Sequence, residues 1–441
     1  MTGEVRSRGR AVAGSGLGMT RRRRLLVTGF VALAFYAYAW TVQPNRPQLT
    51  AVFATPPKLP TVLENGIRPS EAGTPAVQYQ AHRWGWYAAW YDQFHYARMA
   101  RAIARGQLPG VGWDAKHMVQ KNPSDPHEIA SFSYGLGYPA VGAVFYGLGF
   151  HGDPFVVPDG LLFALAAMLA LIVAERVLSP VTAFVVVNVL VLTAPLVRYF
   201  VIPYGTSLTA VAVLLGLVLV TGDRFDWKLG AAFGVVAALT FAARYADLVW
   251  LVVLVSIPLV RRWRESWRVI VAFASAIAVA AVIVLWAQDR AFGDPFTTPY
   301  HFVHNGLDAS WKAYRLRQIP KAAVGVFLTG DRSKLFGIDP IVRDFPWLVL
   351  APFGLVSLFL RRHPLRFVLL LATVAGVASS ISYLAWVFGD TADLPYWIIR
   401  FHTSWFFLWA ILAGVVVDRL LLSIAGADAA WLSQPATTVA P

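Results

Sequence analysis

The stretch LGAAFGVVAALTFAARYADLVWLVVLVSIPLV, residues 229–260, decides how the rest of the chain is arranged. It is apolar and carries no charge except at Arg244 and Asp247, near its middle. About 20 residues cross a bilayer, so the run could form one tilted helix or two short ones. In a single helix each charge would lie unhydrated at mid-membrane, at about 2.5–3.5 kcal/mol on insertion scales. We therefore predict two short spans joined by a charged turn.

Clusters of basic residues set the orientation of these two spans. Lys and Arg in short loops stay on the cytoplasmic side of a membrane protein. Such clusters lie at Arg21 to Arg24, Arg261 to Arg268 and Arg361 to Arg366. Two topologies place all three clusters on the same side of the membrane. In the first, 229–260 crosses twice and the Gly- and Pro-rich stretch 133–150 does not cross. In the second, 133–150 crosses and 229–260 crosses once. The first solution also hydrates the charged turn, and it is the prediction made here.

The apolar segments predict an all-α polytopic membrane protein, a bundle of about ten transmembrane helices. Hydrophobic residues make up 57% of the chain and charged residues only 14%. A soluble core of this length would not need so many uninterrupted apolar runs. Beyond a first span at 25–42, they lie at about 160–178, 181–200, 205–222, 229–260, 268–287, 345–361, 366–388 and 402–422.

The spans divide the chain into five parts. We expect a cytoplasmic basic N-terminus (1–24), a first transmembrane helix (25–42), an extracytoplasmic loop with juxtamembrane helices (43–158), a transmembrane bundle (159–422) with a second extracytoplasmic loop (288–344), and a cytoplasmic tail (423–441). Ala37-Tyr38-Ala39 imitates a signal-peptidase site. The amount of membrane-embedded sequence that follows favours an uncleaved first span.

Charge and cysteine content narrow the function classes. The formal net charge is +14, but much of the basic excess lies beside apolar runs, where Lys and Arg set topology and meet anionic headgroups. Membrane lipids are therefore expected partners, and nucleic acid is not. The chain has no cysteine, which excludes disulfides, thiolate metal sites and a Cys nucleophile.

The segment WYDQFHYARMARAIARG, residues 90–106, holds the first candidate catalytic residue. Wound as a helix, it places Tyr96 and Met99 on an apolar stripe and Arg101 on the opposite side. Asp92 lies on the apolar stripe. It could cap the helix, or it could act as a general base whose pKa is raised by the neighbouring aromatic rings.

Three further segments carry polar residues in or beside apolar runs. AFGDPFTTPYHFVHNG, residues 291–306, could be no more than a turn that leaves a helix. Arg244 and Asp247 could neutralise one another, although ionisable residues within spans generally mark functional paths. In YLAWVFGDTADLPYWIIRFH, residues 383–402, Arg400 begins the last span. There it could simply extend to the interface beside aromatic residues.

Taken in order, these segments resemble the GT-C superfamily of membrane glycosyltransferases. The likeness covers about residues 90–420 and consists of an ordered series of short motifs. They are an acidic residue before an Ala- and Arg-rich helix in a large first loop, YGLGYPAV (134–141), Arg-x-x-Asp in a short internal span, FGDPFTTPY (292–300), KLFGIDP (334–340) and a last aromatic segment that ends in Arg400.

Two positions depart from the family pattern. The usual pair of adjacent acidic residues in the first loop is Asp92-Gln93 here, and the familiar Tyr-Pro-Pro-Gly is replaced by Gly137-Tyr138-Pro139. Both departures bear on the subfamily and on its dependence on a metal.

The resemblance implies an inverting glycosyltransferase with its active site on the extracytoplasmic side of the cell membrane. Sugar would move from a polyprenyl-phosphate donor to an envelope glycan, a glycolipid or a protein. Asp92 would take the proton of the acceptor hydroxyl. Cationic side chains would hold the departing phosphate: Arg400, Arg315, Arg317, Lys334 and His301. Four residues would shape the cavity: Arg244, Asp247, Tyr96 and Tyr300.

A divalent cation could assist this chemistry. Hard oxygen and imidazole ligands gather in the first loop, at Asp114, His117, Asp125, His127 and Glu128, of which Asp125, His127 and Glu128 are the main candidates. Their spacing matches no ligand signature, so a solvated polar loop is the alternative.

Two other function classes fit a polar membrane bundle. A transporter or lipid flippase would also contain charges within its spans, but transporters commonly carry inverted repeats, and no repeat is evident in this sequence. A non-catalytic partner in a membrane assembly is the third possibility.

Overall fold

The structure is a computed structural model that describes most of the predicted bundle. It covers residues 19–42, 62–63, 66–67, 96, 99–101, 103–106, 113–114, 119–120, 136–151, 153–201, 205–223, 225–243, 245–292, 341–387 and 402–425. These residues are helical apart from turns and two pairs of two-residue antiparallel strands. The pairs are β1 (Val62–Leu63) with β2 (Gly66–Ile67), and β3 (Trp113–Asp114) with β4 (Val119–Gln120).

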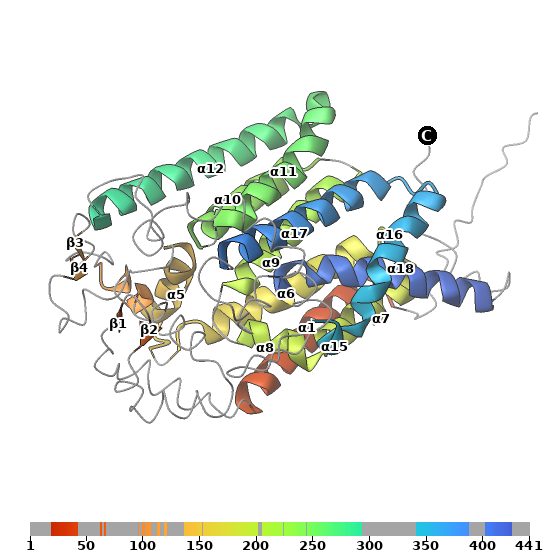
Figure 1. Cartoon of the computed structure of the whole chain (residues 1–441), viewed down its shortest axis with the longest axis horizontal. Coiled ribbons are helices and arrows are strands. Elements are labelled where there is room, and N and C mark those ends of the chain that lie inside the picture. Colours follow the sequence, from red (N-terminus) through yellow and green to blue (C-terminus); the bar gives the residue numbers. More distant parts are fainter. Residues whose placement is uncertain are drawn as a thin grey trace, which may run out of the picture.

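Helices of 4 to 30 residues make up most of the described part of the chain (Figure 1). They are α1 (Arg21–Val42), α5 (Gly137–Gly147), α6 (Val156–Ala174), α7 (Pro180–Val191), α8 (Ala194–Val201), α9 (Thr206–Thr221), α10 (Trp227–Ala243), α11 (Tyr245–Arg261), α12 (Trp263–Phe292), α15 (Ile341–Asp344), α16 (Ala351–Leu360), α17 (Arg366–Val387) and α18 (Phe406–Ala425). Two 3-10 turns, η3 (Pro346–Leu350) and η5 (Thr403–Trp405), precede α16 and α18.

Four of the described segments are long and apolar enough to cross a membrane. They belong to α1, α6, α12 and η5 with α18, and a fifth arises if the bent pair α7 and α8 counts as one span. Apolar helices of this length are typical of membrane proteins. The described fold is therefore all-helical, with four or five candidate membrane spans.

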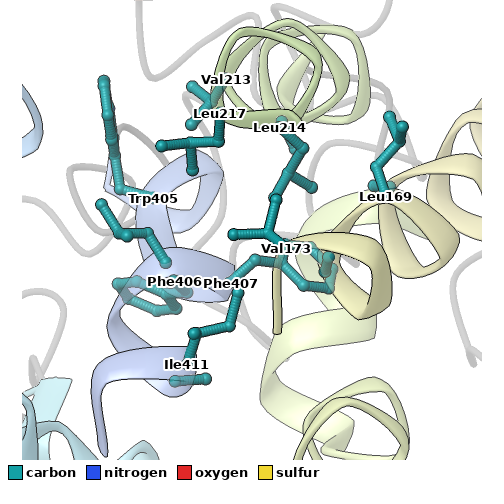
Figure 2. Close-up of a cluster of buried hydrophobic side chains, with 14 of the residues drawn as sticks. Leu169, Val173, Val213, Leu214, Leu217, Trp405, Phe406, Phe407 and Ile411 are labelled. Carbon is teal, nitrogen blue, oxygen red and sulfur yellow. The ribbon is translucent and has the colours of Figure 1, made fainter. Parts of the chain in front are cut away.

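Helix α9 lies at the centre of the bundle. All of its residues from Thr206 to Thr221 are buried, and it packs against α6, α10, α11 and η5. Figure 2 shows the apolar core where α6, α9 and the start of α18 meet. The labelled side chains there are Leu169, Val173, Val213, Leu214, Leu217, Trp405, Phe406, Phe407 and Ile411.

Contacts along the helices define their relative directions. Asp159 bonds Ser207 near the starts of α6 and α9, and Arg176, just past α6, bonds Thr221 at the end of α9, so these two helices are parallel. Helix α1 is antiparallel to α6, because its early Arg24 pairs with Glu175, just past the end of α6. We call the two ends of the bundle the Asp159 end and the Glu175 end.

The stretch 229–260 forms two helices, as predicted. Helix α10 ends at Ala243 and α11 begins at Tyr245, and the two fold back on one another, because Gly216 of α9 meets both Phe233 of α10 and Val255 of α11. The expected hydration is wrong for Asp247, which is 0% exposed in the first turn of α11 and bonded to Ser379. Within the Gly- and Pro-rich stretch 133–150, the described residues 136–150 form one helix, α5, which has 11 residues. At 1.5 Å per residue this helix extends about 17 Å, about half the thickness of a bilayer core.

The predicted span 181–200 is not one straight helix. Helices α7 and α8 are separated by a break and bent by 61°. Pro195 lies in the first turn of α8. A proline has no N–H to donate, and its ring clashes with the carbonyl four residues earlier, which is that of Val191, the last residue of α7.

Glycine allows α10 and α12 to approach closely. A Cβ at Gly230 would lie 2.7 Å from Cγ1 of Val269, and a Cβ at Gly234 would lie 2.7 Å from Cβ of Ala276. Small residues four apart form such a contact surface between membrane helices. Because Gly230 meets Val269 and Gly234 meets Phe273, the two helices run parallel.

Candidate functional site

A buried carboxylate joins three elements at the Asp159 end. Asp159 is 1% exposed. The Tyr138 hydroxyl of α5 donates to its Oδ2 at 2.6 Å, and the Ser207 hydroxyl of α9 donates to its Oδ1 at 2.5 Å. A buried charge requires such donors, because water no longer solvates it. These three side chains, with Tyr96 and Phe155, are called the Asp159 cluster below.

Helix geometry favours a negative charge at this position. Asp159 lies in the first turn of α6, and Ser207 lies in the first turn of α9. The first turn of a helix carries unpaired N–H groups and the positive end of the helix dipole. Both helices therefore stabilise the Asp159 carboxylate. Gly205, with φ of 69°, starts α9, and its α-carbon lies against the ring of Tyr138.

Aromatic rings enclose the hydroxyl end of this contact. The ring of Phe155 stacks on that of Tyr138 with centroids 4.4 Å apart, and Tyr96 meets Tyr138 edge-on at 5.1 Å. Asp153 accepts the N–H of Phe155 at 3.0 Å and so fixes the turn before α6. Burial, and then the nearby Asp159 charge, raises the pKa of Tyr138 well above its ordinary value of 10. Tyr138 therefore stays protonated and remains a donor at neutral pH.

Tyr96 belongs to the segment predicted to be an amphipathic helix. The described residues of this segment, called the Tyr96 segment, are helical at 96, 99–101 and 103–104. Tyr96, Met99 and Ala100 are buried and Arg105 is exposed, but Arg101, which was predicted on the opposite side, is half-buried with its Nε atom buried. The expected apolar stripe is confirmed at these positions. It packs on α5, since a Cβ at Gly142 would lie 3.0 Å from Cβ of Ala100.

A second buried carboxylate lies at the same end of the bundle. Asp247, in the first turn of α11, is 0% exposed, and its Oδ1 accepts the Ser379 hydroxyl of α17 at 2.5 Å. Helix α11 is parallel to α9, because short connections of five residues and one residue join α9 to α10 and α10 to α11, and Gly216 meets both Phe233 of α10 and Val255 of α11, so the chain reverses direction at each connection. Asp247 and Ser207 therefore lie toward the same end of the bundle.

The turn η5 adds buried polar atoms to this end. His402, Thr403 and Ser404 are each 0% exposed. The hydroxyl of Ser404 and the indole N–H of Trp405 make no hydrogen bond with any described residue. Two further hydroxyls share that state, those of Thr206 in α9 and Ser380 in α17. Buried polar atoms are nearly always paired in native proteins, so such groups suit a water or a bound polar molecule.

Most of the other predicted site residues lie outside the described part of the chain. Of the proposed cavity, Tyr96 and Asp247 are described, and both lie at the Asp159 end. Of the metal candidates, the structure gives only the backbone of Asp114, in β3. The residues that lie outside the described part are Asp92, His117, Asp125, His127, Glu128, Arg244, Tyr300, His301, Arg315, Arg317, Lys334 and Arg400.

Sequence reasoning missed Asp159 and its two hydroxyl partners. Asp159 follows Pro158 at the predicted edge of a loop, and that context resembles an ordinary helix start. Its partners are 21 and 48 residues away in the sequence, so no local pattern connects them. The available signal was the placement of a carboxylate directly against a long apolar run.

The comparisons with known proteins leave the site unassigned. No family model matches the chain, and no curated protein or solved structure matches it significantly. Among the residues that the structure describes, no three His, Asp or Glu side chains gather as a metal site would require.

Proposed function

We propose that the protein is a membrane glycosyltransferase of the GT-C type, which transfers sugar with inversion from a polyprenyl-phosphate donor on the extracytoplasmic side. The observation that carries the proposal is the difference between the two ends of the bundle. At the Asp159 end, buried hydroxyls and an indole N–H have no described partner. At the Glu175 end, Arg24 and Arg176 bind Glu175 and Thr221.

The segments that carry the predicted chemistry connect to this polar end. Asp92 precedes Tyr96 by four residues, and Arg400 precedes the buried His402 by two. A lipid-linked sugar phosphate needs a groove open to the bilayer, cations at the departing phosphate and a base on the opposite face of the anomeric carbon. In this proposal Asp92 is the base and Arg400 is the first of the cations. Arg315, Arg317, Lys334 and His301 are the other cations.

The arrangement of helices supports ten crossings as part of the proposal. Besides the long spans and the bent pair, five shorter apolar helices lie at Thr206–Thr221, Trp227–Phe241, Val249–Arg261, Pro346–Leu360 and Arg366–Ser380. The directions derived above for α1, α6, α9, α11 and the α10–α12 pair agree with ten crossings and so support this part of the proposal. A further case is α16, which lies parallel to α18 with Gly354 against Leu412 and Ser357 beside Arg419.

One observation favours the alternative, a transporter or lipid flippase. Transporters bind substrate where a membrane helix is interrupted, and the α7–α8 pair is interrupted at Pro195. Asp159 and Asp247 are buried carboxylates of the kind that transport paths use. The assay below therefore includes a transport measurement.

Sugar transfer by the purified chain tests the proposal. We expect protein in lipid nanodiscs to transfer sugar from a radiolabelled polyprenyl-phosphate donor, and we expect Asp92→Asn to lower turnover about 10²- to 10⁴-fold, the usual contribution of a general base. Asn retains the size and capping ability of Asp but cannot accept the proton. The matched control is Asp223→Asn, a change at an exposed residue of the Glu175 end.

Each outcome has a definite meaning. Near-normal turnover of Asp92→Asn would make Asp92 a helix cap and direct the search for the base to Asp114, Asp125 and Glu128. Absence of transfer, together with movement of a fluorescent polyprenyl phosphate across vesicle membranes, would identify the transporter. Addition of EDTA tests the divalent cation, because loss of transfer that Mg²⁺ or Mn²⁺ restores would establish a metal.

A further inference from the structure

The contacts of the Asp159 cluster connect the Tyr96 segment to the centre of the bundle. Ser207 of α9 and Asp159 of α6 share one hydrogen bond, and Asp159 and Tyr138 of α5 share the next. The ring of Tyr138 then contacts Tyr96. Four elements between Tyr96 and α9 thus meet through one carboxylate and one phenol.

We propose that Asp159 is a positioning residue, which acts through Tyr138 to hold the Tyr96 segment against the bundle. The docking itself follows from the contacts above. Its importance for sugar transfer rests on the proposed function, in which Asp92, four residues before Tyr96, must be held at a fixed distance from the donor.

The chemistry of the hydrogen bond gives this contact its strength. Hydrogen bonds to charged groups contribute more than those between neutral groups, and loss of one partner leaves the buried charge unsatisfied. Asp159 is 1% exposed and Tyr138 is 0% exposed, so solvent cannot replace either partner. Because Tyr138 stays protonated, the contact persists throughout the neutral pH range.

The packed ring of Tyr138 couples the position of its hydroxyl to the position of Tyr96. Tyr138 lies between the stacked ring of Phe155 and the edge of Tyr96. Gly205 is also close, because a Cβ added to this glycine would lie only 3.3 Å from Cγ of Tyr138. The ring cannot rotate away from Asp159 without moving these neighbours. Gly142 of α5 packs directly on Ala100, so α5 and the Tyr96 segment are in contact at two positions.

A single cysteine can report on the docking, because the chain has none of its own. Met99 is 0% exposed on the Tyr96 segment, and Met99→Cys gives a thiol that a bulky maleimide reaches only when the segment leaves its buried position. Ala183→Cys, 0% exposed in α7, is the second reporter and detects loosening of the whole bundle. Both are measured in the full chain in nanodiscs.

Loss of the hydroxyl should release the segment. We expect Tyr138→Phe to raise the labelling rate of Met99→Cys about tenfold or more, because it leaves the buried carboxylate without one donor. Asp159→Leu should do the same. Asp159→Asn, in contrast to Asp159→Leu, should leave the labelling of Met99→Cys slow, since the asparagine amide can accept from Tyr138 and donate to Ser207. The matched control is Tyr146→Phe on the same helix, where the ring faces His151.

Two further readouts separate a positioning role from a general structural one. The double variant Asp159→Leu with Tyr138→Phe should label no faster than either single variant, because one contact is lost in all three. Ala183→Cys should label at an unchanged rate. Unchanged labelling of Met99→Cys in Tyr138→Phe would overturn the proposal, and so would an equal rise at Ala183→Cys.

Sugar transfer from a radiolabelled polyprenyl-phosphate donor distinguishes this inference from the proposed function. If both the proposed function and the positioning role hold, Tyr138→Phe lowers kcat and leaves the KM for the donor nearly unchanged. The single variant Asp159→Asn then has a kcat close to that of the unaltered chain. If the unaltered chain transfers no sugar but the labelling pattern is as expected, the docking stands and the proposed function fails. If transfer occurs and Tyr138→Phe alters neither labelling nor kcat, the positioning role fails alone.

Discussion

Two buried carboxylates occupy equivalent positions in different helices. Asp159 and Asp247 each lie in the first turn of a helix, and each accepts a hydroxyl from a serine of another helix, Ser207 and Ser379 respectively. The helix N-terminus and the hydroxyl together stabilise the charge. Each carboxylate thereby joins two helices at the Asp159 end.

The Asp247 contact leads to a prediction that two adjacent serines can test. Ser379→Ala removes a donor from a buried carboxylate and should lower the free energy of unfolding by about 1–3 kcal/mol. Ser380→Ala should be nearly neutral, because the Ser380 hydroxyl makes no hydrogen bond in the described structure. Denaturant unfolding in mixed micelles measures both, and equal effects would show that Ser379 contributes only its volume.

The partners of Arg244 and Asp247 show which single-residue contacts the sequence could predict and which it could not. A pair of Arg244 and Asp247 was predicted near one face of the membrane, and the burial of Asp247 agrees with a structural role. Arg244 lies outside the described residues, so the pair stays a prediction. Ser379 lies 132 residues from Asp247, and no periodicity or charge pattern connects residues at that distance.

Close glycine contacts determine how several elements pack. Besides the α10–α12 contact, a Cβ at Gly354 of α16 would overlap the carbonyl oxygen of Leu412 in α18. Helices in lipid gain little from the hydrophobic effect between them, so close van der Waals contact contributes most of their association. A glycine at such a contact cannot be enlarged without separation of the helices.

The α10–α12 contact gives a second prediction. Gly234→Ala should destabilise the protein by about 1–3 kcal/mol through overpacking, although alanine favours a helix over glycine by about 1 kcal/mol. The added Cβ would lie 2.7 Å from Cβ of Ala276 and 3.0 Å from the carbonyl oxygen of Phe273. Gly147→Ala is the control, since a Cβ there meets no atom within 4 Å. In thermal unfolding followed by tryptophan fluorescence, Gly234→Ala should have a lower Tm than Gly147→Ala, and the reverse order of the two Tm values would refute the overpacking explanation.

Element boundaries were predictable where charge or backbone chemistry marks them. The division of 229–260 into α10 and α11 followed from the cost of placing two charges at mid-membrane. Glycine and proline indicated that 133–150 would not form a long helix, and α5 has 11 residues. The break between α7 and α8 was missed because hydropathy alone treats 181–200 as one run, although Pro195 marks the break.

At the scale of the whole molecule, the two ends of the bundle differ in chemistry. The Glu175 end contains arginines paired with acidic and hydroxyl groups, including Arg21 and Arg24 with Glu175. Buried carboxylates occur at both ends, but at the Asp159 end the printed partners of Asp159 and Asp247 are hydroxyl groups. On the proposed topology, the first end faces the cytoplasm, as the positive-inside rule requires.

Thiol labelling of single cysteines tests this orientation. Asp223 and His151 are exposed at the Glu175 end and the Asp159 end respectively, and the chain has no cysteine to interfere. In intact cells, a membrane-impermeant maleimide should label His151→Cys and leave Asp223→Cys unlabelled until the membrane is permeabilised. The opposite pattern would invert the topology and place the candidate site in the cytoplasm.

Sequence predicted the class of fold better than the site. Composition and charge parity depend on sums over many residues, so single errors do not change an all-helical, apolar architecture. The Asp159 cluster depends on contacts between residues far apart in the sequence, and those contacts exist only once the helices have packed. Of the residues that the sequence indicated, Tyr96 lies in the Asp159 cluster and Asp247 lies toward the same end of the bundle, and the part of either in a functional site stays a prediction.

The ion pair between Arg24 and Glu175 bears on the order in which the protein is made. The two residues lie 151 positions apart. Ribosomes add about 5–20 residues per second, so the arginine waits on the order of ten seconds for its acidic partner. During that interval the only described partner of the Arg24 guanidinium is the carbonyl of Met19, and we expect the charge to stay at the membrane surface, because burial without a carboxylate would be costly. We expect α1 to reach its final depth only when α6 has been synthesised, which makes the insertion of the first helix a two-step event in biosynthesis.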